Sequence, residues 1–310
     1  MSDQHKPVLL EEAITGLNIK PDGIYVDATF GRGGHSQAIL NRLGSTGRLI
    51  ALDKDPAAVM HGKTGLFQQD ARFSIEQASF ATMKEVIERR ELLGKVSGVL
   101  MDLGVSSPQI DDPRRGFSFS KDGPLDMRMD TTQHMDAALW LNTADEAEIR
   151  DVLKEYGEER FAKRIANAII RRRESLKLST TKELASLIAA AVPFCDRYKH
   201  PATRTFQGIR IFINRELDDL KVGLQQSIAV LADGGRLCVI SFHSLEDRLV
   251  KRFIQRESEG ESLPRGLPIK EDDIEKRLTK IGKMVLPSES EIGQNPRARS
   301  ARLRIAERRL

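Results

Sequence analysis

The sequence predicts an α/β fold with a Rossmann-like, mostly parallel sheet and an inserted all-helical domain. Short apolar, β-branched runs alternate with helical patterns between residues 24 and 102, as is typical of βαβ units. The alternation stops at residue 104, and a strand pattern resumes only at 236–242. A glycine-rich turn follows the first predicted strand, where α/β sheets usually bind ligands.

The first hundred residues contain four strand patterns with helical patterns between them. The predicted strands are 23–30, 48–53, 72–77 and 96–104, and the predicted helices are 33–43, 56–62 and 81–93. Asp55 is expected to cap the second of these helices, because Pro56 suits the first helical position.

The middle and the end of the chain follow different patterns. Residues 106–130 are rich in Pro, Gly, Asp and Arg and predict a long ordered loop. The next predicted elements are helices at 144–156, 158–175, 181–191 and 204–231, a strand at 236–242, a helix at 245–255, a loop at 258–278 and paired antiparallel strands at 283–286 and 301–307. Thr180 or Thr181 with Glu183 is typical of a capping box. We therefore expect an α/β domain formed by 1–109 and 204–310, with a helical insertion for substrate recognition at 110–203.

Composition excludes several protein classes. No stretch of the 310 residues approaches the roughly 20 apolar residues of a membrane span. The N-terminus lacks a secretory signal pattern, so a cytoplasmic location and no membrane partner are expected. Cys195 and Cys238 form no CxxC motif and the six histidines are scattered, so neither a disulfide nor a metal site is predicted.

The net charge of +4 conceals an uneven distribution along the chain. Residues 110–159 hold 6 basic and 13 acidic residues, residues 160–215 hold 13 and 3, and residues 296–310 hold 6 and 1. Two interpretations stay open: the basic segments bind a polyanion such as a nucleic acid, or they are solvated helix faces and an arginine-rich strand.

Carboxylates are predicted beside the glycine turn at the carboxyl edge of the sheet. Asp53 ends the second strand 20 residues after Gly33, where an acidic side chain can accept hydrogen bonds from a ribose. A nicotinamide site requires a third glycine at the position of Ser36. Asp27 and Asp102, at the ends of the first and fourth strands, suit a cofactor that carries a positive amino or sulfonium group. The pattern therefore favours S-adenosylmethionine over NAD.

Longer strings resemble one family of enzymes from about residue 6 to 308. They are TFGRGGHS (29–36), MDLGVSSPQ (101–109), RGFSF (115–119), DGPLDMRMD (122–130), YGEER (156–160), HPATRTFQ (200–207), SFHSLEDR (241–248) and NPRARSARLR (295–304). In this order they resemble the RsmH/MraW family of bacterial ribosomal RNA methyltransferases. The resemblance implies a class I S-adenosylmethionine-dependent methyltransferase that methylates N4 of a cytidine in the decoding centre of 16S rRNA, with the small ribosomal subunit as partner.

The resemblance also implies which residues bind the cofactor. They are Gly33, Gly34, His35, Asp53, Phe80, Asp102 and Gln109. For two of them alternatives stay open, because Phe80 could be a core residue and His35 a helix cap. No catalytic base is assigned: amino-methyltransferases of DNA often carry an Asp/Asn-Pro-Pro-aromatic string here, and this chain has DLGVSSPQ at 102–109. We hypothesise that Asp102 lies near the reacting centre.

Substrate-binding residues are less well defined by the sequence. Phe117, Phe119, Met127 and Met129 could cover the site or belong to a core. Arg171–Arg173 and the helix start at 203–210 are the leading candidates for RNA contacts, and His243 could face the site or only form a turn. Two other functions remain open, an NAD-dependent oxidoreductase and an RNA-binding ribosome assembly factor with a vestigial methyltransferase fold. The sequence does not indicate an oligomeric state.

Overall fold

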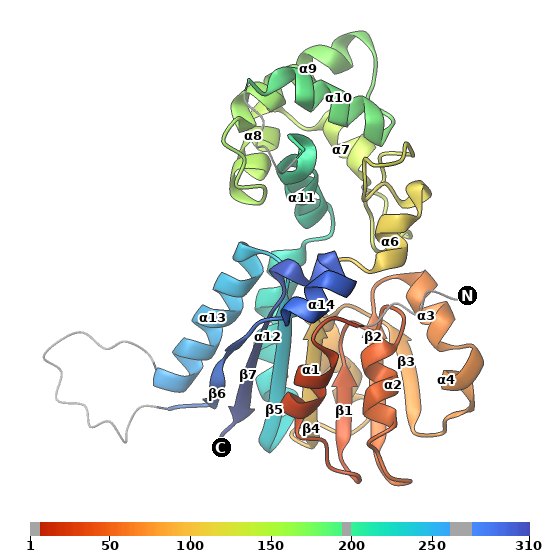
Figure 1. Ribbon diagram of the computed structural model, residues 1–310, viewed down its shortest axis with the longest axis vertical. Helices are drawn as coiled ribbons and strands as arrows, with labels where there is room; N and C mark the ends of the chain where they lie inside the picture. The colour runs from red at the N-terminus through yellow and green to blue at the C-terminus, as the bar shows by residue number, and fades with distance from the viewer. Residues whose placement is uncertain (1–6, 194–199, 261–274) are drawn as a thin grey trace, which may run out of the picture. The chain divides into compact units, whose positions relative to one another are not determined.

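A computed structural model describes residues 7–193, 200–260 and 275–310, so Cys195 and most of the predicted 258–278 loop lie outside the described residues (Figure 1). The chain divides into two compact units. One α/β unit comprises residues 1–104 and 217–310, and a helical unit comprises residues 105–216. No described helix has both the length and the apolar character needed to cross a membrane.

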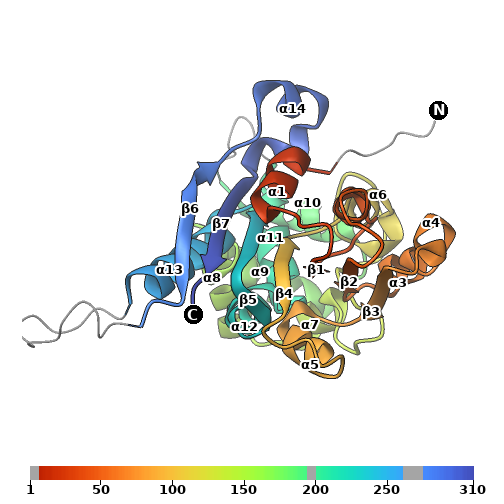
Figure 2. The ribbon, with the colours of Figure 1, turned by 90° about the horizontal axis from the view of Figure 1, so that it is seen from below.

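Seven strands of the α/β unit form a single sheet in the order β3-β2-β1-β4-β5-β7-β6 (Figure 2). The strands are β1 (Ile24–Asp27), β2 (Arg48–Asp53), β3 (Phe73–Gln77), β4 (Val96–Asp102), β5 (Leu231–Ser241), β6 (Leu278–Val285) and β7 (Arg302–Arg308). β1 to β5 are parallel, and β7 pairs antiparallel with both β5 and β6. The predicted Rossmann-like, mostly parallel sheet and its antiparallel final pair are confirmed.

Helices cover both faces of this sheet (Figure 2). On one face lie α1 (Leu10–Leu17), α2 (Gly34–Leu40), α3 (Pro56–Gly62) and α4 (Gly65–Gln69), and on the other lie α5 (Met83–Glu88), α12 (Glu216–Val230) and α13 (Ser244–Glu259). α14 (Glu289–Gln294) precedes β7. Because both faces are covered, the central strands are almost continuously apolar, and Val99, Leu100 and Met101 of β4 are fully buried.

The helical unit has a core of its own. It contains α6 (Ser107–Asp111), α7 (Ala137–Thr143), α8 (Glu146–Glu155), α9 (Ala162–Ser175), α10 (Thr181–Ala191) and α11 (Ala202–Ile213). Trp140, Ile165, Leu184 and Ile209 are among the residues buried between these helices. The predicted capping box is present at the start of α10, formed by Thr180 and Glu183.

Two sequence predictions are wrong at the junction between the units. The predicted 204–231 helix is two helices, α11 and α12, because Arg215 adopts a left-handed φ of 52° that ends α11. The helical unit also extends beyond the predicted insertion 110–203, since Phe206, Ile209 and Ile213 of α11 pack in its core.

Smaller differences concern short helices. α1, α4, α6, α7 and α14 were not predicted, and the predicted 81–93 helix is a 3-10 turn (Phe80–Thr82) followed by the shorter α5. The Asp55 cap of α3 is confirmed, because its carboxylate accepts a hydrogen bond from the Ala57 amide at 2.9 Å.

Candidate active site at the carboxyl edge of the sheet

The strand order reverses at β1, which pairs with β2 on one side and β4 on the other. Asp27, the last residue of β1, is in register with Ala51 of β2 and Leu100 of β4. Asp53 and Asp102 therefore each extend two residues beyond Asp27, one on either side of it. This crevice is where open α/β sheets bind ligands.

The segment after β1 is bonded to both flanking carboxylate residues. Thr29 accepts a hydrogen bond from the Asp102 amide at its hydroxyl, at 2.6 Å, and the Gly31 amide donates to Asp53 Oδ2 at 2.7 Å. The turn is thus held between the ends of β4 and β2. Thr29 begins the TFGRGGHS string, but its residue type alone does not indicate this contact with the end of β4.

Glycine is required in this turn by backbone conformation and by packing. Gly31 and Gly33 have φ values of 57° and 75°, and Gly33 caps α2. A Cβ atom at Gly33 would lie 2.4 Å from the ring of Phe67, and one at Gly34 would lie 2.2 Å from Pro7. The turn therefore brings bare backbone amides to the start of α2, where they can approach a ligand.

The buried side chain of Asp27 stabilises the glycine turn that follows β1. Its carboxylate accepts hydrogen bonds from the Ser36 hydroxyl at 2.6 Å and from the Thr29 amide at 3.2 Å. The side chain is fully buried, and this burial raises its pKa to about 6. Asp27 thus orders the turn from within the protein, and Ser36, at the third glycine position of a nicotinamide motif, is its partner.

Asp53 carries a carboxylate that is oriented by the backbone. One oxygen accepts from the Gly31 amide and the other from the Asp55 amide at 2.8 Å. Burial raises the pKa of Asp53 to about 6, although both hydrogen bonds oppose the shift. Each carboxylate oxygen has a second lone pair, so Asp53 can still accept hydrogen bonds from a ribose.

Asp102 provides a buried acceptor without a partner. Its Oδ1 atom has no hydrogen-bond partner among the described residues, and burial, followed by the nearby Asp27 and Glu246 charges, raises its pKa well above the usual value. An orphaned buried oxygen is costly unless a ligand completes it. The atom therefore fits a ligand that presents a positive charge or an N–H group.

His35 lies beside Asp102 as a neutral imidazole. Burial lowers its pKa to about 4, and its Nε2 lies 3.2 Å from the Val8 carbonyl, which can only accept. Nε2 therefore carries the proton, and the lone pair of Nδ1 faces Asp102 Oδ2 at 3.6 Å. The two side chains do not form an ion pair.

Phe80 lies at the start of the 3-10 turn before α5, next to a charged network. Ser79 donates a hydrogen bond to Asp219 Oδ2 at 2.7 Å, and the same oxygen lies 2.6 Å from Lys54 Nζ. Gly223 of α12 faces the Phe80 ring, and a Cβ atom there would approach it to 2.7 Å. This network connects the residue after Asp53 with the residue before Phe80, and no local sequence pattern indicates it because Asp219 is distant in the chain.

Six of the seven predicted cofactor-binding residues thus lie in the α/β unit. The seventh, Gln109, lies in the helical unit, where its side chain accepts a hydrogen bond from the Ser106 amide at 2.8 Å and closes the capping box of α6.

The predicted aromatic loop belongs largely to the core of the helical unit. Met127 is fully buried, and Phe117 and Phe119 pack against the same core. Phe119 contacts Phe206 edge-on at a ring separation of 4.9 Å. Of the two interpretations of this loop, the core packing is confirmed for these three residues.

The arginine run on α9 is only partly exposed. Arg173 donates hydrogen bonds to the carbonyls of Leu141 and Ala144 at the end of α7, and Arg172 donates to the Leu176 carbonyl. Arg171 is exposed. Arg173 therefore stabilises the helical unit, which weakens the prediction that all three arginines contact RNA.

His243 caps α13, and its ring nitrogen Nδ1 lies 3.4 Å from the Glu246 amide.

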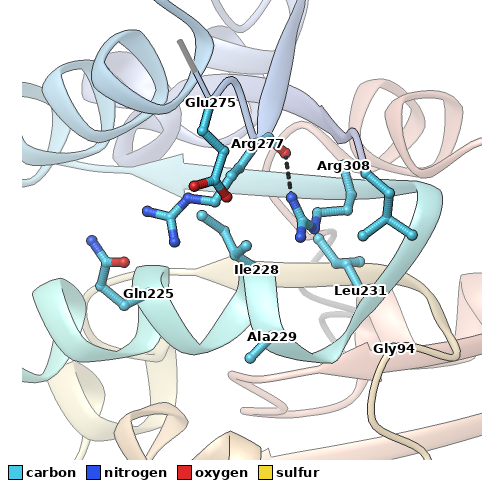
Figure 3. Close-up of a pocket in the computed structure, with 9 residues that line it drawn as sticks. Gly94, Gln225, Ile228, Ala229, Leu231, Glu275, Arg277 and Arg308 are labelled. Atoms are coloured by element: carbon cyan, nitrogen blue, oxygen red, sulfur yellow. Dashed lines mark hydrogen bonds between the residues drawn. The ribbon is translucent and has the colours of Figure 1, made fainter. Parts of the chain in front are cut away.

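A cavity of about 350 Å³ lies elsewhere in the α/β unit, between Gln225 of α12, Arg277 and the end of β7 (Figure 3). There Arg308 donates a hydrogen bond to the Arg277 carbonyl at 3.0 Å. None of the predicted cofactor-binding residues lines this cavity.

Comparison with known proteins assigns the chain to a family. Residues 2–309 match the MraW methylase family. The chain belongs to the MraW methylase family. This confirms the family resemblance of the sequence. Members of the family named ribosomal RNA small subunit methyltransferase H, from the RSA 331 and CbuK_Q154 strains of Coxiella burnetii, are 60% identical over 306 residues and 99% of both chains.

Two solved structures resemble the chain at lower sequence identity than these family members. A putative rRNA methylase from Clostridium thermocellum is 12% identical, with a TM-score of 0.46 over 98% of both chains. A SAM-dependent O-methyltransferase from Thermotoga maritima is 11% identical, with a TM-score of 0.42 over 100% of this chain and 69% of that one.

Proposed function

We propose that this protein transfers a methyl group from S-adenosylmethionine to N4 of a cytidine in the decoding centre of 16S rRNA, in the cytoplasm. Membership of the methylase family supports methyl transfer, and relatives named for small-subunit ribosomal RNA support the substrate. The structural observation that carries the proposal is the orphaned Asp102 oxygen beside the glycine turn at the strand-order reversal.

The cofactor would be held along the carboxyl edge. The amides of Gly33 and Gly34 and the side chain of His35 would contact its methionine half, and Asp53 its ribose. Phe80 would contact the adenine and Asp102 the charged end, and Gln109 is a further proposed cofactor contact. When bound, S-adenosylmethionine supplies a methyl group on a positively charged sulfur, which leaves as a neutral thioether.

Because the pKa values of Asp53 and Asp102 are raised, binding of a positively charged ligand should change the protonation of these carboxylates. A nearby positive charge favours ionised carboxylates and opposes the effect of burial. Binding should therefore release protons near pH 6, where Asp53 titrates. His35 stays neutral in this range because its pKa is about 4.

Substrate activation would also involve Asp102. The lone pair of the cytosine amine nitrogen is delocalised into the ring. An acceptor that binds one of the amine N–H groups would localise this lone pair on the nitrogen. Asp102 Oδ1 is a free buried acceptor that suits this role. The cytidine must leave its stack to reach the site, as for other enzymes that modify bases.

Calorimetric titration with S-adenosylmethionine and with NADH tests the cofactor assignment. We expect binding of the first and none of the second. Binding of NADH alone would favour the oxidoreductase alternative and overturn the proposal.

Transfer of a labelled methyl group tests the reaction and the form of the substrate. The protein is incubated with naked 16S rRNA, with immature small subunits and with mature small subunits. We expect label in at least one of them. Binding to RNA or subunits without transfer to any of the three would favour the assembly-factor alternative.

A further inference from the structure

A basic groove lies between α13 and the outer strand β6, away from the predicted cofactor-binding residues. Its volume is about 320 Å³. Lys251 of α13 and Lys280 and Lys283 of β6 line it, and its apolar wall includes Ile254 and Ile281. We call it the α13–β6 groove.

The net charge of the α13 sequence does not indicate that this groove is basic. The helix carries four basic and four acidic residues, so its formal charge is zero. However, three of the acidic side chains, Glu246, Asp247 and Glu257, are at most 6% exposed. Asp247 pairs with arginines of β7, and Glu257 pairs with Arg256 and Arg277. The exposed face of α13 is therefore predominantly basic.

An irregularity in β6 brings two lysines to the same groove. Residues separated by three positions on a regular strand point to opposite faces. Between Ile281 and Val285 the pairing with β7 shifts, so that β6 contains two extra residues there, and Gly282 has a φ of 63°. Lys280 and Lys283 consequently both line the groove. Bulges of this kind often re-aim side chains at functional sites.

The described lining of the groove contains three lysines and one acidic residue, Glu259, whose carboxylate accepts a hydrogen bond from Gln255 at 3.0 Å. Lys251, Lys280 and Lys283 have no ion-pair partner among the residues described by the structure, whereas Arg304 at its edge is paired with Asp247. The Ser258 hydroxyl also lines the groove, is buried, and has no hydrogen-bond partner within the described ranges. It offers a donor to a phosphate oxygen.

We infer that the α13–β6 groove binds the sugar–phosphate backbone of the RNA substrate. This inference rests on the proposed function and adds a contact surface outside the active site. Lysines bind phosphates as point charges and read no bases, so the groove would position the RNA without selecting the cytidine. Such contacts contribute affinity that falls steeply with salt.

The test compares two triple variants with equal loss of charge. Lys251, Lys280 and Lys283 are changed to Gln in one, and the exposed Lys20, Lys63 and Lys95 are changed to Gln in the control. Fluorescence anisotropy with a 16S rRNA transcript measures affinity over a series of salt concentrations. We expect the groove variant to bind about 10- to 100-fold more weakly, with a salt slope smaller by about 2 to 3 than that of the wild type.

Further measurements separate the groove from the active site and from a lipid surface. The affinity for S-adenosylmethionine and the turnover at saturating RNA should be unchanged in the groove variant. The inference is overturned if both triples bind RNA alike. It is also overturned if the groove triple loses only binding to phosphatidylserine vesicles. If the wild type itself transfers no methyl group, the proposed function fails instead.

Discussion

The ion pair between Lys54 and Asp219 offers a sharp test of how the cofactor site is positioned. Asp219 is 14% exposed and Lys54 17% exposed, and they lie 2.6 Å apart. Asp219→Asn removes the negative charge that lies 2.6 Å from this largely buried ammonium. Loss of one partner of a fully buried pair costs roughly 3–5 kcal/mol, so with partial exposure we expect about 2–3 kcal/mol of lost stability.

Part of this loss should be measurable as weaker cofactor binding. Lys54 follows Asp53, and Ser79, the other partner of Asp219, precedes Phe80. Both proposed contacts with the adenosine half therefore depend on this network. We expect the Kd for S-adenosylmethionine to rise about tenfold, or about 1.4 kcal/mol, in isothermal titration calorimetry.

The adjacent residue provides the matched control. Asp218 is 51% exposed and pairs with the exposed Lys221, so Asp218→Asn removes the same charge from the same helix. It should change the Kd less than twofold and the free energy of unfolding by less than about 0.5 kcal/mol. If Asp219→Asn lowers stability but leaves the Kd at the wild-type value, the network supports only the fold and our reasoning is refuted.

Four further predictions concern the carboxylates and the arginine run. Asp102→Ala should lower both cofactor affinity and turnover about 10- to 100-fold, which corresponds to the loss of a hydrogen bond to a charged group. Wild-type values of both would exclude the proposed role of Asp102. The wild-type Kd for S-adenosylmethionine should rise about tenfold from pH 7 to pH 5, because protons compete for Asp53 with its pKa of about 6, and a flat calorimetric profile would contradict this. The folded-state pKa of Asp27 is also raised to about 6, so its contribution to stability is present below pH 4 and lost as the pH rises through 6. In urea unfolding, the free energy of unfolding of Asp27→Asn relative to that of the wild type should therefore rise by up to about 3 kcal/mol between pH 4 and pH 7. A difference that does not change with pH would contradict this prediction. Arg173→Gln should destabilise the protein by about 1–2 kcal/mol in thermal unfolding and Arg171→Gln by less than about 0.5 kcal/mol, and equal effects would disprove the capping role.

Local patterns predicted most of the sheet and the carboxylates at its edge. β2 was predicted with its observed ends because its apolar run is bounded by Arg48 and Asp53. Asp53 and Asp102 could be located because each ends a strand, and parallel strands end at one edge. The family resemblance was needed for His35 and Phe80, whose residue types alone allow a purely structural role.

Features that depend on distant contacts could not be predicted. Ser79 and Asp219 are 140 positions apart, so no local pattern connects them. The break between α11 and α12 coincides with Asn214, whose side chain hydrogen-bonds to Met127 and Met129 of a remote loop. The charge of the α13–β6 groove emerges only when the fold buries three of the four acidic side chains of α13.

Mass spectrometry of the methylated nucleoside tests the central claim most directly. The protein is supplied with S-adenosylmethionine carrying a deuterated methyl group and with small ribosomal subunits. One portion of the 16S rRNA is then digested to nucleosides, to identify the methylated nucleoside, and another to oligonucleotides, to locate it. We predict deuterated N4-methylcytidine from a single position in the decoding centre. Label at C5 of cytidine, on a ribose, on another base or nowhere would contradict the account.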